Sequence, residues 1–251
     1  MPGYTQDNRP IRVTTSLGAN ALLLTRFAGY EGVSTPFSFQ LDMVSENAAI
    51  DAKAMLRQPV TVTLDLHNGG KRHFHGLINR FTQLGTDPSE LTGYRAEVVP
   101  WLWFLTLARD CRIFQKKTVA EIIEAVFKET GYTDFDMKVS GLKPRDFCVQ
   151  YRETNFNFVS RLMEEEGLFY FFMHTDSKHT LVIADKNSAV TAGVISTARI
   201  GSAAKPTEDV IESVERDHSV YVGKVTLSEY DWQQPSLTLR KIGRASCRER
   251  V

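Results

Sequence analysis

Hydrophobic and polar residues alternate along much of the first hundred residues, which is the period of a β-strand with one buried face. This pattern predicts strands at residues 11–15, 21–27, 37–43, 60–66, 71–81 and 91–99. The tripeptide Asn68-Gly69-Gly70 predicts a tight turn between two of them, and residues 84–89 read as a loop. Residues 52–57 predict a short helix that stops before Pro59. Turn-linked strands at this density predict a small antiparallel β-barrel over residues 1–100, with a sandwich as the alternative.

The segment from residue 149 to residue 172 predicts a strand, a helix and a second strand. Residues 149–152 form the first strand, and Thr154 or Asn155 caps the following helix. Gly167 is expected to end that helix in a left-handed conformation. The unbroken apolar run at 168–172 predicts a strand that is buried on both faces. One helix face is apolar and is formed by Phe158, Val159, Leu162 and Met163.

A second helix is predicted just after Thr118. Thr118 and Glu121 have the spacing of a capping box, and Gly131 ends the helix. Its apolar face is formed by Val119, Ile122, Ile123, Val126 and Phe127. The aromatic residues of 100–109 mark a domain junction, residues 174–178 a polar turn, and residues 179–184 a strand that pairs with the preceding one. Residues 101–188 are therefore expected to form an α+β domain.

The last part of the chain predicts a linker and an incomplete second β-barrel over residues 189–241. Residues 189–207 are small and polar, and strands are expected at 210–216, 221–231 and 237–240. Residues 242–251 lack any strand or helix pattern and resemble the translation of a sequencing-library adaptor, so we expect a non-native tail there. The fold class expected for the whole chain is α+β, mainly β.

Composition restricts the partners. The 251 residues include 30 lysines and arginines and 30 acids, a balance that gives no reason to expect nucleic acid or an anionic membrane surface. Residues 1–12 have no apolar core, and no apolar run approaches a bilayer's thickness. We therefore expect synthesis in the cytoplasm and no stable membrane insertion. Cys111, Cys148 and Cys247 form no disulfide framework.

Catalytic and metal-binding motifs are sparse. The chain contains no G-x-S-x-G, P-loop, G-x-G-x-x-G or H-E-x-x-H motif. His73 and His75 share a strand face and could hold a metal, but no third ligand is evident, so two ordinary histidines on a sheet surface are favoured. His174 and His179 flank a turn and are expected to face solvent. Small buried thiols are expected at Cys111 and Cys148. No cofactor is expected.

Three glutamates, Glu164, Glu165 and Glu166, lie in the last turn of the central helix, where the dipole disfavours acids. A solvated acidic cap is the favoured interpretation, and a contact with a basic surface of a partner subunit is the alternative. Arg161 can pair with Glu164 or Glu165. Glu153 and the three glutamates could also suggest a hydrolase, but their helical setting places them on an exposed surface. The sequence therefore favours a protein that is not an enzyme.

The central segment also resembles the signature of VgrG proteins, the spike proteins of type VI secretion, which are related to contractile-phage tail hubs and to the phage late-control protein D. Residues 101–105, 110–115 and 178–181 are similar to the same family, and the resemblance runs from about residue 11 to 239. The residues that carry the signature are Gln150, Tyr151, Arg152, Glu153, Phe156, Phe158, Arg161, Leu162, Glu165, Gly167 and Tyr170.

The resemblance implies a phage tail hub-like order of barrel, α+β domain and second barrel, truncated before any OB-fold or needle. It implies a homotrimer that caps the tube of Hcp protein, contacts baseplate and effector proteins, and is secreted through the type VI apparatus without a signal peptide. A contractile-phage tail hub is the alternative within the class. A hydrolase that uses Glu153 or residues 164–166 is the alternative from another class.

Overall fold

The computed structural model describes residues 4–67, 69–86, 90–190, 199–202, 210–217, 220, 224–230, 233–236 and 239–244. The chain divides into two compact units, Met1–Ser196 and Thr197–Val251, and each is described by itself. The finer domain boundaries expected at residues 100, 188 and 241 remain predictions.

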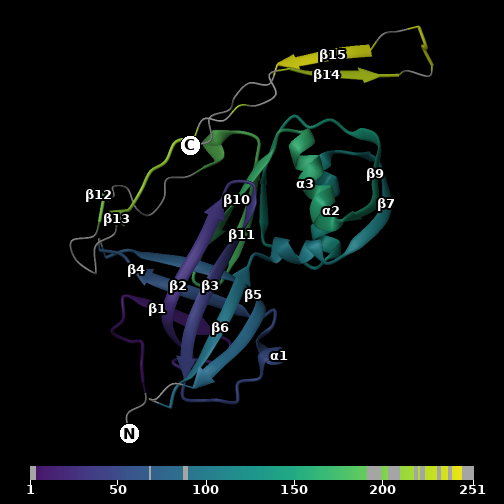
Figure 1. The fold of residues 1–251 in the computed structure, drawn as a ribbon. Helices are drawn as coiled ribbons and strands as arrows, with labels where there is room; N and C mark the ends of the chain where they lie inside the picture. Colours follow the sequence, from purple (N-terminus) through teal and green to yellow (C-terminus); the bar gives the residue numbers. More distant parts are fainter. Residues whose placement is uncertain are drawn as a thin grey trace. The chain divides into compact units, whose positions relative to one another are not determined.

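A curled antiparallel sheet of six strands occupies the first half of unit 1 (Figure 1). The strand order is β1-β4-β5-β6-β3-β2, so each predicted strand of this region is present. Leu84, expected in a loop, instead lies in the extended strand β5. The strands are β1 (Ile11–Thr15), β2 (Leu23–Gly32), β3 (Thr35–Ser45), β4 (Pro59–Asp65), β5 (Lys71–Thr86) and β6 (Thr92–Val99).

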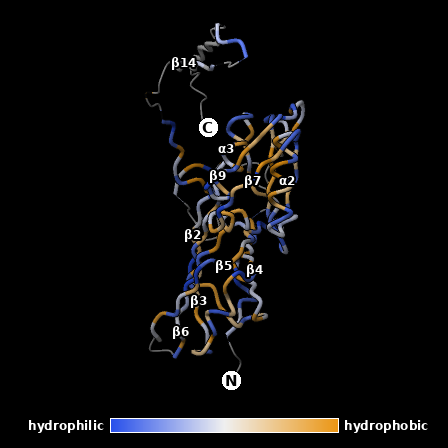
Figure 2. Tube along the Cα trace, turned by 90° about the vertical axis from the view of Figure 1, so that its right-hand side faces the viewer, coloured by the Kyte–Doolittle hydropathy of each residue, from blue (hydrophilic) through white to orange (hydrophobic). Residues whose placement is uncertain are grey.

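The concave face of this sheet holds one hydrophobic core. Strand β3 shows the predicted alternation, because Phe37, Phe39, Leu41 and Met43 are each 1 % exposed. The rings of Phe37 and Phe39 stack with centroids 4.5 Å apart. Figure 2 shows hydrophobic and hydrophilic residues alternating along these strands. The short helix α1 (Ala52–Met55) adds the fully buried Met55 to the same core.

The side chain of Gln6 connects β1 and β2, the two edge strands of the sheet. Its Oε1 accepts the backbone N–H of Val13 at 3.0 Å and that of Leu24 at 3.1 Å. Its Nε2 donates to the carbonyls of Val13 at 3.2 Å and Leu22 at 3.1 Å. Gln6 is only 4 % exposed, so one buried amide satisfies four backbone groups that a closed barrel would pair between strands.

The rest of unit 1 is an α+β arrangement, as predicted. A 3₁₀ helix, η1 (Trp101–Thr106), leads into it. Strands β7 and β9 pair antiparallel, and a second sheet has the order β10-β11-β8. The sequence interpretation missed β7 and β8. The elements are β7 (Arg109–Lys117), α2 (Val119–Glu129), β8 (Phe135–Lys138), β9 (Arg145–Thr154), α3 (Asn155–Glu165), β10 (Phe169–His174) and β11 (His179–Ala184).

Both helices begin as the sequence predicts. Thr118 and Glu121 form the capping box, and Thr154 rather than Asn155 caps α3 by accepting the N–H of Asn157 at 3.1 Å. The two helices pack together in a single core, enclosed by β7 and β9 in Figure 1. The predicted apolar faces are confirmed: Val119, Ile122, Ile123, Val126, Phe127, Phe158, Val159, Leu162 and Met163 are all buried.

The prediction that residues 168–172 form a strand buried on both faces is wrong. Phe169, Phe171 and Phe172 are only partly buried, and the following Met173 is 44 % exposed. The reason is position in the sheet: β10 is an edge strand, and the central strand β11 carries the fully buried residues.

The described parts of unit 2 contain two pairs of strands. β12 (Arg199–Ile200) pairs with β13 (Val210–Ile211), and β14 (Lys224–Glu229) pairs with β15 (Leu239–Arg244). β12 lies inside the expected linker, and β15 continues into the expected patternless tail as far as Arg244, because each finds a pairing partner. The fold class, mainly β with an α+β part, is confirmed. The start of a second barrel stays a prediction.

Candidate functional site

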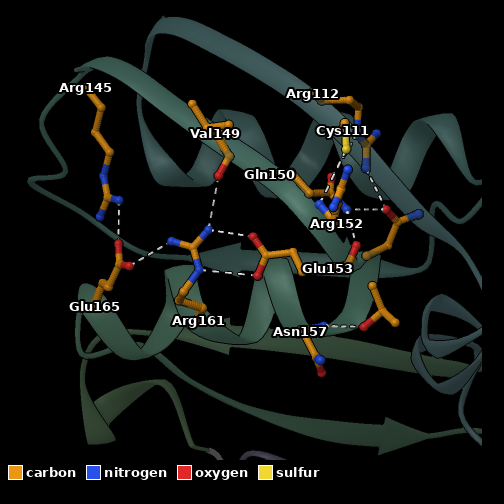
Figure 3. A network of polar contacts seen from close by, with 12 residues as sticks. Cys111, Arg112, Arg145, Val149, Gln150, Arg152, Glu153, Asn157, Arg161 and Glu165 are labelled. Carbon is orange, nitrogen blue, oxygen red and sulfur yellow. Dashed lines mark hydrogen bonds and ion pairs between the residues drawn. The ribbon is translucent and has the colours of Figure 1, made fainter.

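The signature residues cluster on β9, α3 and the start of β10, where they form a buried apolar side and two polar networks (Figure 3). The first network surrounds Gln150, which is 0 % exposed. Its Oε1 accepts Arg112 Nε at 2.9 Å, and its Nε2 donates to Asn155 Oδ1 at 2.9 Å and to the Glu153 carbonyl at 3.1 Å. Arg112 also donates to Asn155 Oδ1 at 2.7 Å and pairs with Glu129. One amide thereby connects β7, β9 and the first turn of α3.

The second network surrounds Arg161. Its Nη2 donates to Glu153 Oε1 at 2.7 Å and to the Val149 carbonyl at 3.2 Å, and its Nη1 donates to Glu165 Oε1 at 2.9 Å. Arg145 donates to Glu165 Oε2 at 2.5 Å and to Glu166 Oε1 at 2.7 Å. The guanidinium groups therefore fasten α3 to the strand that precedes it, as Figure 3 shows.

These pairs change the interpretation of the acidic triplet. Glu165 pairs with Arg161, one of the two predicted arrangements. Glu164 and Glu165 are exposed, as the favoured acidic cap implies, but Arg145 of the same chain also pairs with Glu165 and Glu166. Burial raises the pKa of Glu165, but the hydrogen bonds from Arg145 and Arg161 outweigh it and hold that pKa below its usual value. The hydrogen bond to Glu153 raises the pKa of the Arg161 guanidinium.

The apolar signature residues pack into the α+β core. Phe158 and Leu162 are fully buried, and Phe156 packs against the same cluster. Tyr170 is 3 % exposed, and its hydroxyl has no hydrogen-bond partner among the described residues. Gly167 has a φ of +69°, which confirms the predicted left-handed end of α3. These residues specify the fold around the networks.

Arg152 occupies an irregular position in β9. Its φ is +52°, and the register between β7 and β9 shifts between Asp110 and Cys111. The Arg152 N–H donates to Cys111 Sγ at 3.4 Å. Cys111 is exposed rather than buried as expected, because it lies two residues before Ile113 on the same outer face of β7, whereas Cys148 is buried as expected. Arg152 itself is exposed.

The outer face of the β7–β9 pair is apolar and exposed. Ile113 lies opposite Val149 in the register, and Gln115 lies opposite Phe147. Sequence reasoning missed this surface, although the alternation at 147, 149 and 151 was visible, because alternation does not say which of two strand faces meets the core. The inner face of β9 uses Cys148 and Gln150 instead. We call the outer set the β7–β9 apolar face; its exposed fractions are Ile113 67 %, Phe147 66 %, Val149 47 % and Tyr151 65 %.

The histidines lie where sequence reasoning did not expect them. His75 and His179 are buried rather than surface residues, and His174 is nearly buried at 7 % side-chain exposure. The prediction failed because the ends of β10 and β11 that carry His174 and His179 lie against β5, although residues 175–178 between them are exposed. His73 lies on β5 beside Thr63, with Nδ1 and Oγ1 3.1 Å apart. Within the described ranges no histidine, cysteine and carboxylate cluster could hold a metal ion.

None of the described helices has the length and apolar content needed to cross a membrane. The site therefore combines a braced strand–helix unit with an exposed apolar sheet face.

Comparison with known sequences gives this arrangement a family. The sequence pattern of the family described as phage tail baseplate hub (GPD) matches residues 30–248, which is most of the chain. The chain belongs to the phage tail baseplate hub family.

The hub chain is also similar to named spike proteins, which confirms the resemblance to VgrG. It is 38 % identical over 244 residues to the type VI secretion system spike protein VgrG1b of Pseudomonas aeruginosa, covering 93 % of this chain and 32 % of that protein. It is 38 % identical to VgrG1a of the same organism, covering 93 % of this chain and 37 % of that protein. The hub chain therefore spans about a third of the length of these relatives.

Two solved structures share the fold. The Escherichia coli c3393 protein, a component of the type VI secretion system, superposes with a TM-score of 0.64 at 22 % identity, covering 88 % of this chain and 56 % of that one. The tail protein of Neisseria meningitidis MC58 superposes with a TM-score of 0.62 at 12 % identity, covering 95 % of this chain and 68 % of that one. A type VI secretion component and a tail protein thus share the fold described above.

Proposed function

We propose that the hub chain forms the hub-like part of a type VI secretion spike. In this role it is a homotrimer that caps the Hcp tube and carries the puncturing needle and effectors. The observation that carries the proposal is the 38 % identity to VgrG1b over 93 % of the chain. The braced unit around Gln150 and Arg161 supplies a rigid surface for assembly, and the β7–β9 apolar face supplies a surface that a monomer leaves in water.

The size of that face supports self-association. An aromatic side chain offers about 150–250 Å² of surface, so Phe147 and Tyr151, about two thirds exposed, leave roughly 200–300 Å² uncovered between them. Ile113 and Val149 enlarge the same patch. Monomeric proteins seldom expose larger contiguous apolar patches unless these patches bind something. A standard interface buries about 800 Å² per partner, so this face is suited to be the centre of a contact and not all of it.

A double substitution tests the proposed contact. Phe147→Ser with Tyr151→Ser is expected to weaken self-association, measured by sedimentation velocity, by at least tenfold in Kd while the melting temperature changes little. Tyr30→Ser is the matched control, because Tyr30 is also a strand tyrosine and is 62 % exposed. Equal association of the double variant and the control would contradict the proposed contact.

Capping of the Hcp tube is tested separately from self-association. Purified Hcp protein and the hub chain are mixed at equal subunit concentration and analysed by electron microscopy and co-sedimentation. We expect the hub chain at the ends of Hcp stacks. Its absence from those ends would contradict this part of the proposal, and the same assay with an effector protein tests cargo binding.

We also propose that this chain has no enzymatic activity. General acid catalysis needs a carboxyl group whose pKa is raised toward neutrality, whereas Arg145 and Arg161 lower that of Glu165. Glu153 is held by the same Arg161. The hydrolase alternative is tested by Glu153→Gln and Glu165→Gln: loss of turnover on a model substrate with assembly intact would favour an enzyme.

A phage tail hub is the alternative that the fold also supports, because the Neisseria meningitidis tail protein superposes over 95 % of this chain. The genes beside this one separate the two functions, since sheath and ATPase genes of a secretion system support a spike, and head and tail genes support a phage. In the spike role the protein is made in the cytoplasm and leaves through the type VI apparatus without a signal peptide. Detection of the hub chain in culture medium only when that apparatus is intact tests this route.

A further inference from the structure

Three histidines meet where the six-stranded sheet contacts the α+β part of unit 1. His75 belongs to β5, His179 begins β11, and His174 ends β10. The Nδ1 atoms of His75 and His179 are 2.9 Å apart. The Nδ1 atom of His174 lies 3.0 Å from the backbone N of His75. The histidines lie among aromatic rings, with the centroid of Phe37 4.9 Å from that of His174 and 5.4 Å from that of His179.

The hydrogen bonds determine where the protons of the two buried rings lie. The backbone N–H of Trp101 donates to His179 Nε2 at 3.0 Å, so that nitrogen is an acceptor. Nδ1 of neutral His179 therefore carries the proton and donates to Nδ1 of His75, which leaves the proton of His75 on Nε2. An extra proton on either ring would place two N–H groups against each other, at Trp101 or between the rings. The hydrogen bonds from the Trp101 amide to His179 and from His179 to His75 therefore form together only while both rings are neutral.

We propose that His75 and His179 form a proton-sensitive clasp, intact at neutral pH and opened by mild acid, between the six-stranded sheet and the α+β part. The clasp joins elements that are far apart in sequence, because β5, the start of η1 at Trp101 and β11 meet in it. Its opening would free β10 and β11 from β5 without requiring the rest of the sheet to unfold. The inference concerns this chain's own fold and does not depend on the proposed function.

Charged groups around the clasp do little to hold a proton there. From β2, Glu31 contacts His174 Nε2 at 3.0 Å and Arg72 at 2.9 Å, so its charge is shared with groups outside the pair. Asp134, from the loop before β8, pairs with Lys178 at 3.2 Å. From β10, His174 adds a repulsive neighbour to the pair when it is charged.

Burial is the main cause that keeps both rings neutral. It lowers the pKa of His75 to about 4, with repulsion from His174 adding to the effect and attraction to Asp134 opposing it. Burial also lowers the pKa of His179 to about 2, and repulsion from His75 and His174 adds to it. Each ring regains an ordinary pKa of 6.5 once the clasp opens to water.

The sign and size of the effect follow from these values. A group whose pKa is depressed in the closed state binds more protons when open, so the closed state loses stability as pH falls below about 6.5. Between pH 7 and pH 5 the opening equilibrium should rise roughly 20-fold for each histidine and several hundredfold for the pair.

Native-state hydrogen exchange on the full chain tests the clasp. After correction for the intrinsic pH dependence, we expect the protection of the Trp101 amide and of the β11 amides to fall several hundredfold from pH 7 to pH 5. The amides that join β3 to β6, such as those around Leu41 and Ala96, should keep their protection. Equal loss in both regions, or no loss at Trp101, would overturn the proposal.

Substitutions identify the groups responsible. His75→Gln and His179→Gln should each make the fall in Trp101 protection between pH 7 and pH 5 about 20-fold smaller. His73→Gln, on the same strand as His75, should leave that fall unchanged. A full-sized effect in either of the first two variants would overturn the proposal. If those variants do not fold, carbon-13 NMR of the wild-type rings decides: both should be neutral at pH 5.5 while the Trp101 amide is protected. A protonated ring beside a protected Trp101 amide would refute the clasp.

Discussion

Gln150 should contribute more to the stability of the region formed by β7, β9 and α3 than a single uncharged side chain usually does. Gln150→Leu keeps the side chain's approximate volume but removes three hydrogen bonds, one of them to the charged Arg112. Neutral hydrogen bonds contribute about 0.5–1.5 kcal/mol each, and one to a charged group about 1.5–3 kcal/mol. Better burial of an apolar side chain offsets about 1 kcal/mol of this sum. We expect a net loss of about 3 kcal/mol in the free energy of unfolding.

Urea denaturation followed by tryptophan fluorescence measures that loss, and a melting curve should show a decrease of about 6–12 °C for a unit of this size. Gln115→Ser is the control, because Gln115 lies on the partner strand β7 and is exposed, and serine adds no apolar surface to the β7–β9 apolar face. The control should change stability by less than about 0.5 kcal/mol. If Gln150→Leu matched the control, the buried amide would not connect β7, β9 and α3 in the way described here.

Three further predictions concern single residues. Gln6→Met should lower the free energy of unfolding by about 3 kcal/mol, because four buried backbone groups lose their hydrogen-bond partner. A loss of less than about 1 kcal/mol in urea denaturation would contradict closure of the sheet by the Gln6 amide. Gly167→Val should destabilise the folded protein by more than about 1 kcal/mol, and Gly167→Asn by less, because the penalty comes from the positive φ of this residue and not from crowding by other atoms. Equal melting temperatures for the two variants would refute this. In the native protein a thiol reagent should modify Cys111 within minutes and Cys148 only after unfolding, because Cys148 is buried and burial raises its pKa; rapid labelling of both would contradict the burial described.

Local patterns predicted the elements well where backbone chemistry alone decides them. The capping box at Thr118 and the left-handed Gly167 depend only on nearby atoms, and both were predicted correctly. Alternation along β3 also sufficed, because every second residue there enters one core.

Prediction failed where a distant segment decides burial. Tyr151 and Val149 lie on the exposed face of β9, because Gln150 on the opposite face finds Arg112 and Asn155, which sequence spacing could not reveal. His179 is buried because Trp101 and His75 meet it from other elements. The second partner of Glu165 was missed because Arg145 lies 20 residues earlier in β9, whereas the pair of Glu165 with Arg161 was predicted. Each case is a tertiary contact that overrides a local preference.

Copies of this chain should associate through the β7–β9 apolar face, and site-specific photo-crosslinking detects that contact in solution. A benzophenone side chain replaces Tyr151 in one variant and the equally exposed Tyr30 in another, and both proteins are irradiated at a concentration where the wild type associates. We predict covalent dimers and trimers of the chain from position 151 and only monomers from position 30. Monomers alone from position 151, or equal crosslinking from both positions, would contradict association through this face.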